Sequence, residues 1–241
     1  MLIIPAINLL GDKVVWLRQG DPARSTVYSD DPVAVARQFV ELGARRLYVH
    51  DLDSRAGGSL PHLDAATRIA IETGVEVQFA SALADDAALQ DALARPFTQI
   101  VLRADYVVGT PFLGDALGGS GVARLVVRLD VRDGNVTIET PGRAGVVDPV
   151  VLARELVDAG APRLIYSDLN RDGMLGGPNY AGLRALLRMV DAPVMVSGGI
   201  AHADHIRNLD RLGVEAAIVG KALYTGDLSL RGHLDDHGHW R

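Results

Sequence analysis

Residues 31–52 read DPVAVARQFVELGARRLYVHDL, and residues 148–169 read DPVVLARELVDAGAPRLIYSDL. The two stretches lie 117 positions apart and are identical at 12 of their 22 positions. In each copy, Asp-Pro is typical of a helix start, and apolar residues follow at helical spacing. Gly-Ala then ends the helix, and a short apolar run indicates a buried parallel strand. A match of this length predicts that the chain consists of two similar halves.

The same offset relates further segments of the chain. Residues 75–83 match residues 192–200, and residues 100–106 match residues 217–223. Each half therefore holds about four strand–helix units, and two such halves predict an α/β fold, the (β/α)8 or TIM barrel made of two duplicated half-barrels. A doubly wound open sheet is the alternative fold. It would need a glycine-rich fingerprint after the first strand, which INLLGDKV does not provide.

The length of 241 residues predicts one barrel domain over residues 1–241, with half-barrels of about 1–120 and 121–241. A net charge of -6 and scattered arginines argue against nucleic acid as a partner. No apolar run is long enough to span a membrane, and no targeting segment is apparent, so we expect a cytoplasmic protein by default. The chain has no cysteine, which excludes disulfides and a thiol nucleophile. No stripe suggests an oligomer, so we expect a monomer.

Two strand ends carry the pattern of a phosphate site. The expected seventh strand, PVMV, is followed by Ser197, Gly198 and Gly199, and the eighth, AAIV, is followed by Gly220 and Lys221. Barrels of this kind commonly hold phosphate in the loops after strands seven and eight. Glycines there let backbone N–H groups approach an anion closely, although they also simply turn a strand into a helix. We predict a phosphate site at these five residues, together with Gly177.

The repeat supplies an internal comparison for this site. In the first half, the corresponding turns read Ala80-Ser81-Ala82 and Arg103-Ala104, without glycine. Each Cβ narrows the approach and disfavours positive φ. An equivalent phosphate site in the first half should therefore be absent or weaker. Arg103 could attract an anion by its charge, but a surface ion pair is the favoured interpretation.

Several motifs resemble those of the HisA/PriA family of phosphoribosyl isomerases, in particular its actinobacterial dual-substrate form. They are IPAINLL at 4–10, LDV at 129–131, SDLNRDGMLGGPN at 167–179, SGGI at 197–200 and IVGKALY at 218–224. The resemblance implies an Amadori rearrangement, from aminoaldose to aminoketose, of an N-linked phosphoribosyl amine of histidine and/or tryptophan biosynthesis. It implies no cofactor. The family's histidine substrate carries two phosphates and its tryptophan substrate carries one.

The resemblance also assigns catalytic positions. The family uses an Asp at the end of strand one as base and an Asp at the end of strand five as acid; these positions hold Asn8 and Asp130 here. A carboxamide cannot accept a proton near neutral pH. Asn8 is then an inactivating change, or Asp168 or Asp51 takes over as the base, or the protein serves another reaction or only binds. Both Asp168 and Asp51 have the alternative role of bonding loop backbone.

The other departures from the family lie in the first half or in the part of the site that would hold the second phosphate-bearing end of the histidine substrate. Trp16 stands where the family usually has an arginine, and is expected to pack rather than stack on substrate. The pattern disfavours the two-phosphate substrate and predicts one firmly anchored phosphate. The alternative is a catalytically altered barrel that binds a sugar phosphate or serves a specialised pathway. Expected substrate contacts are Arg18, Gln19, Gly20, Ser167 and Arg143.

Three histidines near the C-terminus have the spacing of metal ligands. They are His233, His237 and His239. No cysteine or acidic pattern completes such a site, so a solvated tail is the favoured interpretation and we predict no metal.

Overall fold

The computed structural model describes residues 1–54 and 58–241, and its centre is a closed parallel barrel. The final strand pairs with the first, with Leu2 opposite Ala216 and Ile4 opposite Ile218. This closure confirms the predicted (β/α)8 barrel. In order around the barrel, the strands are β1 (Leu2–Leu10), β4 (Arg46–Asp51), β5 (Glu76–Ala80), β6 (Gln99–Arg103), β7 (Leu125–Val131), β10 (Leu164–Asp168), β11 (Val194–Ser197) and β12 (Ala216–Val219).

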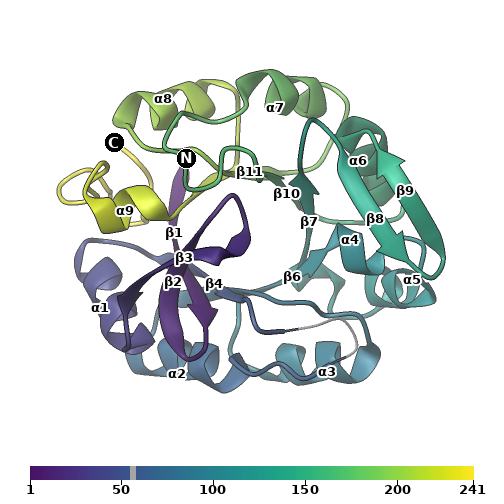
Figure 1. The fold of residues 1–241 in the computed structure, drawn as a ribbon, viewed down its shortest axis with the longest axis horizontal. Helices are drawn as coiled ribbons and strands as arrows, with labels where there is room; N and C mark the ends of the chain where they lie inside the picture. The colour runs from purple at the N-terminus through teal and green to yellow at the C-terminus, as the bar shows by residue number, and fades with distance from the viewer. Residues whose placement is uncertain (55–57) are drawn as a thin grey trace.

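Helices form a ring around these strands, as Figure 1 shows. The ring covers the outer face of the barrel, so the apolar outer side chains of the strands are buried between sheet and helices. The helices are α1 (Pro32–Glu41), α2 (Leu63–Thr73), α3 (Asp86–Ala94), α4 (Ala104–Val107), α5 (Pro111–Gly118), α6 (Pro149–Asp158), α7 (Tyr180–Leu187), α8 (Ala203–Arg211) and α9 (Lys221–Thr225).

Each half begins with the same sequence of elements: a barrel strand, a β-hairpin and a helix. After β1 come β2 (Lys13–Arg18) and β3 (Asp21–Ser29), and after β7 come β8 (Val136–Thr140) and β9 (Arg143–Val147). The two hairpins differ in position. The hairpin β2–β3 pairs with β1 and reaches the barrel mouth, whereas β8–β9 is a separate sheet that packs on α4 at the periphery (Figure 1).

The Asp-Pro pairs of the repeat cap equivalent helices. The Asp31 carboxylate accepts hydrogen bonds from the backbone N–H groups of Val33 and Ala34, both at 3.0 Å. In the second half, the Asp148 carboxylate accepts from the N–H groups of Val150 and Val151. Each proline stands in the first turn, where its missing N–H costs nothing. The helix starts read from the repeat are therefore confirmed.

The interior of the barrel changes character along the strands. Alternate residues of each strand point inward. Toward the N-terminal ends most of them are apolar, such as Ile4, Val126, Ile165 and Met195, and the exceptions Gln78 and Gln99 are buried and hydrogen-bonded to each other. Toward the C-terminal ends the inward side chains become polar, so that the mouth of the barrel can hold a polar ligand.

The C-terminal tail folds back on the start of the chain. The Trp240 N–H donates to the Met1 carbonyl at 3.0 Å, and His239 bridges to Leu2. The side chains of His233, His237 and His239 are exposed, as a solvated tail predicts, but the backbone is held in place. Within residues 1–54 and 58–241, no group of three acidic, histidine or cysteine side chains could hold a metal ion.

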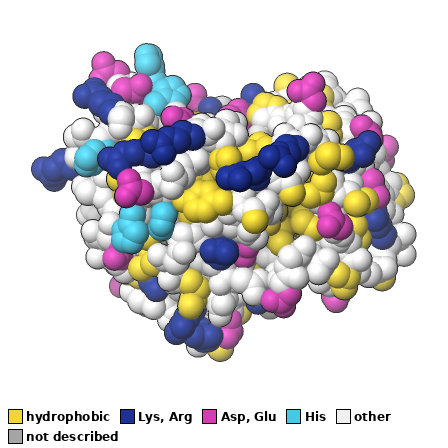
Figure 2. Space-filling model, turned by 90° about the horizontal axis from the view of Figure 1, so that it is seen from above, with side chains coloured by type: hydrophobic (Ala, Val, Ile, Leu, Met, Phe, Trp, Pro, Cys, Tyr) yellow, Lys and Arg dark blue, Asp and Glu magenta, His cyan; other side chains and the backbone are white. Residues whose placement is uncertain are grey.

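The surface mixes charges of both signs. On the face in Figure 2, basic and acidic side chains are interspersed instead of forming one charged patch. Among the described helices, none is long and apolar enough to cross a membrane.

The matched caps predict matched losses of stability. Asp31→Ala and Asp148→Ala should each lower the free energy of unfolding by about 1 kcal/mol, because each leaves two helix N–H groups without the side-chain acceptor. The two losses should add in the double variant, since the caps share no contact. Urea unfolding measures these effects. Asp31→Asn, which keeps an acceptor oxygen, and Asp158→Ala, at the far end of α6, are the controls, and a loss of equal size in either would contradict the capping argument.

Candidate active site

A cavity of about 110 Å³ opens among the C-terminal ends of the barrel strands. Its position is the one where active sites of this fold lie. The first loop and the loop after β10 also reach it. The lining residues are Ala6, Asn8, Trp16, Leu17, Gly20, Tyr48, His50, Leu52, Arg103, Arg128, Asp130, Leu169, Asp172, Ser197 and Ile218.

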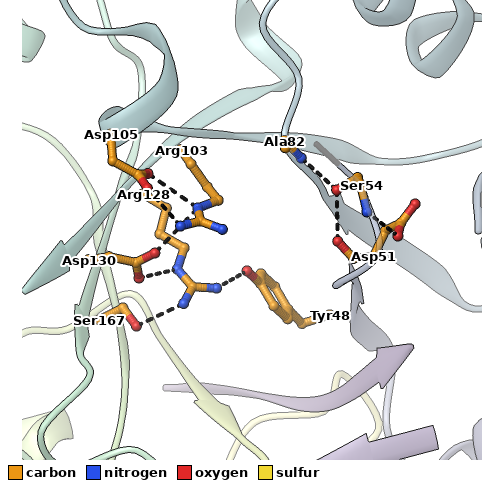
Figure 3. A network of polar contacts seen from close by, with 9 residues as sticks. All are labelled: Tyr48, Asp51, Ser54, Ala82, Arg103, Asp105, Arg128, Asp130 and Ser167. Carbon is orange, nitrogen blue, oxygen red and sulfur yellow. Dashed lines mark hydrogen bonds and ion pairs between the residues drawn. The ribbon is translucent and has the colours of Figure 1, made fainter. Parts of the chain in front are cut away.

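The central feature of the cavity is the buried guanidinium of Arg128, from β7 (Figure 3). Its Nε donates to the Asp130 carboxylate at 2.7 Å, its Nη1 donates to the Tyr48 hydroxyl at 2.6 Å, and its Nη2 donates to the Ser167 hydroxyl at 3.2 Å. These partners come from β7, β4 and β10. A buried cation needs such partners, because desolvation is otherwise too costly.

A second guanidinium, that of Arg103, stands beside the first. It donates to Asp105 through Nε and Nη2, at 3.2 and 2.7 Å, and its Nε lies 3.4 Å from the Asp130 carboxylate. It also lies over the ring of Tyr106, 4.5 Å from the centroid. The expected ion pair of Arg103 is therefore present. The expectation that it lies at the surface is wrong, because the side chain lines the cavity.

The charges of this network set the ionisation of the carboxyl groups. Although burial alone would raise the pKa of Asp130, the guanidinium groups of Arg128 and Arg103 hold it below its usual value. Asp172 differs, because burial raises its pKa to about 6 and Arg128 only partly offsets that effect. Near neutral pH, Asp130 is thus an anion, while Asp172 is poised to gain or lose a proton.

Asn8 reaches the cavity from β1. Its side chain is mostly buried and makes no hydrogen bond to any other described residue, so its amide groups are available to a ligand. It lies opposite His50 in the sheet. Burial, together with the charges of Arg128 and Arg103, lowers the pKa of His50 well below its usual value, which leaves that ring neutral.

The two carboxylates considered as replacement bases serve their own loops. Asp168 accepts from the backbone N–H of Arg171 at 3.3 Å and from the side chain of Asn179 at 2.9 Å. Asp51 accepts from the backbone N–H groups of Asp53, Ser54 and His62. The residues that precede them in the strands, Ser167 and His50, point inward instead. His50 lines the cavity, and Ser167 accepts a hydrogen bond from Arg128. The strand alternation therefore turns both carboxylates toward the helices.

The glycine turns after β11 and β12 lie together, as the sequence predicts, at one side of the cavity. Gly198 has φ +103, and a Cβ there would lie 2.5 Å from the Asp168 carbonyl oxygen, so only glycine fits this approach. Gly177 lies behind the turn and donates its N–H to the Gly199 carbonyl at 2.9 Å. The Lys221 ammonium donates to the Gly173 carbonyl at 2.8 Å.

The space in front of these turns is nearly full. The indole of Trp16 covers Gly220 so closely that a Cβ on that glycine would overlap its six-membered ring. The remaining volume, about 10 Å³, is far smaller than a phosphate needs. Trp16 packs, as expected, but it packs in the place predicted for the anion.

In the first half, the equivalent turn after β5 is already satisfied. The Ala82 N–H donates to the Ser54 hydroxyl at 2.8 Å, and that hydroxyl donates to the Asp51 carbonyl at 2.8 Å (Figure 3). Ser81 is completely buried. These contacts leave the Ala82 N–H occupied, in keeping with the weaker first-half site that the sequence predicts.

The other expected substrate contacts differ in position. Gly20 and Ser167 are at the cavity or its central network, as described above. The Gln19 side chain donates to the Asn170 carbonyl at 2.9 Å, which ties the first loop to the loop after β10. Arg18 is exposed and faces the sulfur of Met174. Arg143 lies in β9 and pairs with Glu155 at 2.5 Å, outside the residues that line the cavity.

Sequence reasoning did not single out Arg128 or Asp172. Arg128 is the one charged residue before Asp130 in the run LVVRLDV, and a spacing of two places both side chains on one face of the strand. That spacing was the available signal. For Asp172, the loop is visible in the sequence, but its approach to the cavity depends on how the loop folds.

Comparison with known proteins identifies the family of the chain. Residues 2–229 match the family described as histidine biosynthesis protein. Relatives in Chloroflexus aurantiacus and Roseiflexus castenholzii are 39% and 40% identical over 230 and 231 residues, covering 95% and 96% of this chain and 95% and 97% of theirs. Both are named 1-(5-phosphoribosyl)-5-((5-phosphoribosylamino)methylideneamino) imidazole-4-carboxamide isomerase. A relative of the same name in Dehalococcoides mccartyi is 38% identical over 231 residues, which cover 96% of this chain and 97% of the relative. The chain therefore belongs to the histidine biosynthesis protein family.

Proposed function

We propose that the protein is an intramolecular isomerase that converts an N-linked phosphoribosyl amine from aminoaldose to aminoketose, the Amadori rearrangement. The observation that carries this proposal is the pairing, in one cavity, of an anionic carboxylate and a carboxyl group poised near neutral pH. The reaction needs an acid at the ring oxygen and a base at C2′, and two carboxyl groups with separated pKa values provide both. The names of the relatives support the same class of reaction.

In the proposed mechanism, Asp172 is the acid. Its pKa of about 6 lets it donate a proton to the ring oxygen, whereupon the C1′–O bond breaks and the Schiff base forms. Asp130 was expected from the resemblance to be the acid, but its two ion pairs keep it ionised, which suits it to accept the C2′ proton. The resulting enolamine gives the ketone by tautomerisation. Asn8 then holds the sugar by hydrogen bonds, without a proton transfer.

One phosphate of the substrate is anchored by the turns at Ser197–Gly199 and Gly220–Lys221. The support for a one-phosphate substrate is the asymmetry of the halves: the first-half turn has no glycine, and its Ala82 N–H is already bonded to Ser54. This asymmetry favours the tryptophan-pathway type of substrate over the two-phosphate type.

A second candidate is a catalytically altered barrel that binds a sugar phosphate. Two observations favour it: the carboxamide of Asn8 at the position of the family's base, and the two cations that weaken Asp130 as a proton acceptor. Turnover separates the two candidates.

Restoring a carboxylate at Asn8 should accelerate the reaction. Asn8→Asp should raise kcat for the one-phosphate substrate by up to about 10²-fold, because it adds a second general base to Asp130, which the two cations weaken, and a general base typically contributes about 10²–10⁴. Absorbance or fluorescence assays with the one-phosphate and two-phosphate substrates measure this. Asn8→Ser is the matched control without a base and should not accelerate turnover. If neither wild type nor Asn8→Asp turns over either substrate, the isomerase proposal fails and the binding candidate stands.

The pH profile of kcat/KM should report the ionisation of Asp172. Since the acid must be protonated, kcat/KM should fall as pH rises through about 6. Asp172→Asn should lose this limb and lower kcat by about 10²–10⁴. Asp236→Asn, at an exposed position of the tail, is the control and should leave the profile unchanged.

The ionisation of Asp172 should also contribute to the pH dependence of the free energy of unfolding. A carboxyl whose pKa is raised by folding binds its proton more tightly in the folded state, so stability falls as pH rises from about 4 to about 6. Asp172→Asn should remove that component of the fall, as urea unfolding at several pH values measures. An identical pH dependence in wild type and variant would show that folding does not raise the pKa of Asp172.

A further inference from the structure

The side chain of Trp16 points from the hairpin β2–β3 into the interior of the barrel. Trp16 is one of the buried central residues of β2, is only 8% exposed, and packs with the lumen residues Ile4, Ala6 and Ile218. It lines both the central cavity and the narrow space in front of the glycine turns. The indole therefore separates the two parts of the site that the proposed substrate would have to occupy together.

The indole also takes the volume of the proposed ligand. Its six-membered ring covers Gly220, its five-membered ring lies against Gly173, and about 10 Å³ remains in front of the turns. In this arrangement the absence of a Cβ at Gly220 makes room for the indole of Trp16. A bound phosphate would need the same close approach to the backbone of Gly220. A phosphate and the indole cannot be present at once.

Two features make this position of Trp16 easy to leave. Its indole N–H is buried and makes no hydrogen bond to any described residue. It lies near Asp172, close enough to favour the ionised form of that carboxyl group, but not in hydrogen-bonding geometry. An unpaired buried N–H destabilises the arrangement that contains it. In addition, the strand pairing is irregular on both sides, between Val14 and Val15 and between Leu17 and Arg18. The segment that carries Trp16 is thus bounded by two interruptions of the ladder.

We propose that Trp16 is a plug of the phosphate site, which the phosphate group of a ligand displaces when it binds. The proposal rests on the proposed function in one respect, the presence of an anion site at Gly198–Gly199 and Gly220. Trp16 then determines affinity through the fraction of protein that is open. The apparent dissociation constant equals the intrinsic constant divided by that fraction, so removing the plug strengthens anion binding.

The test uses inorganic phosphate and the intact chain, and needs no turnover. The protein has two tryptophans, and the second, Trp240, stacks on His233 in the tail. In a Trp240→Phe background, emission reports Trp16 alone. Phosphate, added at constant ionic strength, should shift this emission to longer wavelength, because the indole leaves its buried position. In a Trp16→Phe background, the remaining Trp240 should give no shift.

Affinity supplies the second measurement. By calorimetry, Trp16→Ala should bind phosphate about 10-fold more tightly than wild type or better, and Trp16→Leu, which keeps an apolar side chain in the lumen if alanine destabilises the fold, should also bind more tightly. Phosphate that binds wild type without changing the emission of Trp16 would overturn the plug, as would unchanged affinity in both variants. Absence of phosphate binding to wild type and variants alike would also overturn the plug, because no anion site would then lie behind the indole.

The result is separable from the outcome of the isomerase assays. If turnover fails but phosphate displaces Trp16, the plug stands and the proposed reaction does not. If the protein isomerises the substrate while the emission of Trp16 stays constant, the reaction stands and the plug is wrong.

Discussion

A guanidinium group in the interior of a barrel has to be neutralised and hydrogen-bonded where it stands, and the site depends on how Arg128 meets that requirement. Asp130 supplies the charge, and the hydroxyls of Tyr48 and Ser167 accept the remaining contacts, from three strands. Removing one partner from such a network leaves an uncompensated buried charge, which costs several kcal/mol. The same contacts fix the side chains that a ligand would meet.

The network also separates the chemistry of the two carboxyl groups. Asp130 is surrounded by two cations and stays ionised, while Asp172 is desolvated and retains a proton to higher pH. Their residue type is identical, so the environment alone suits Asp130 to accept a proton and Asp172 to donate one. The cost of this arrangement is a weaker base, because the cations that keep Asp130 ionised also lower its affinity for a proton. Asn8 adds no second base on the first strand.

The two halves share one order of elements but differ at their turns. Both retain the strand, hairpin and capped helix, and both use a strand-end aspartate, Asp51 or Asp168, to bind loop backbone. The turns differ: one half has glycines, and the other has an N–H group bonded by Ser54. Even the glycine turn is covered by a tryptophan from the opposite half. The proposed anion site thus depends on contacts between the halves as much as on its own residues.

The sequence by itself determined the barrel, because a repeat with alternating helical and strand patterns leaves few ways to bury its apolar faces. It also placed the caps at Asp31 and Asp148, which depend only on neighbouring residues. It could not determine the ionisation of Asp130, since Arg103 comes from another strand and the approach of Asp172 depends on a loop. Nor could it show that Trp16 covers the glycine turn at Gly220, because that contact joins residues about 200 positions apart in the chain. Long-range packing and desolvation decided these features, and neither is encoded in local pattern.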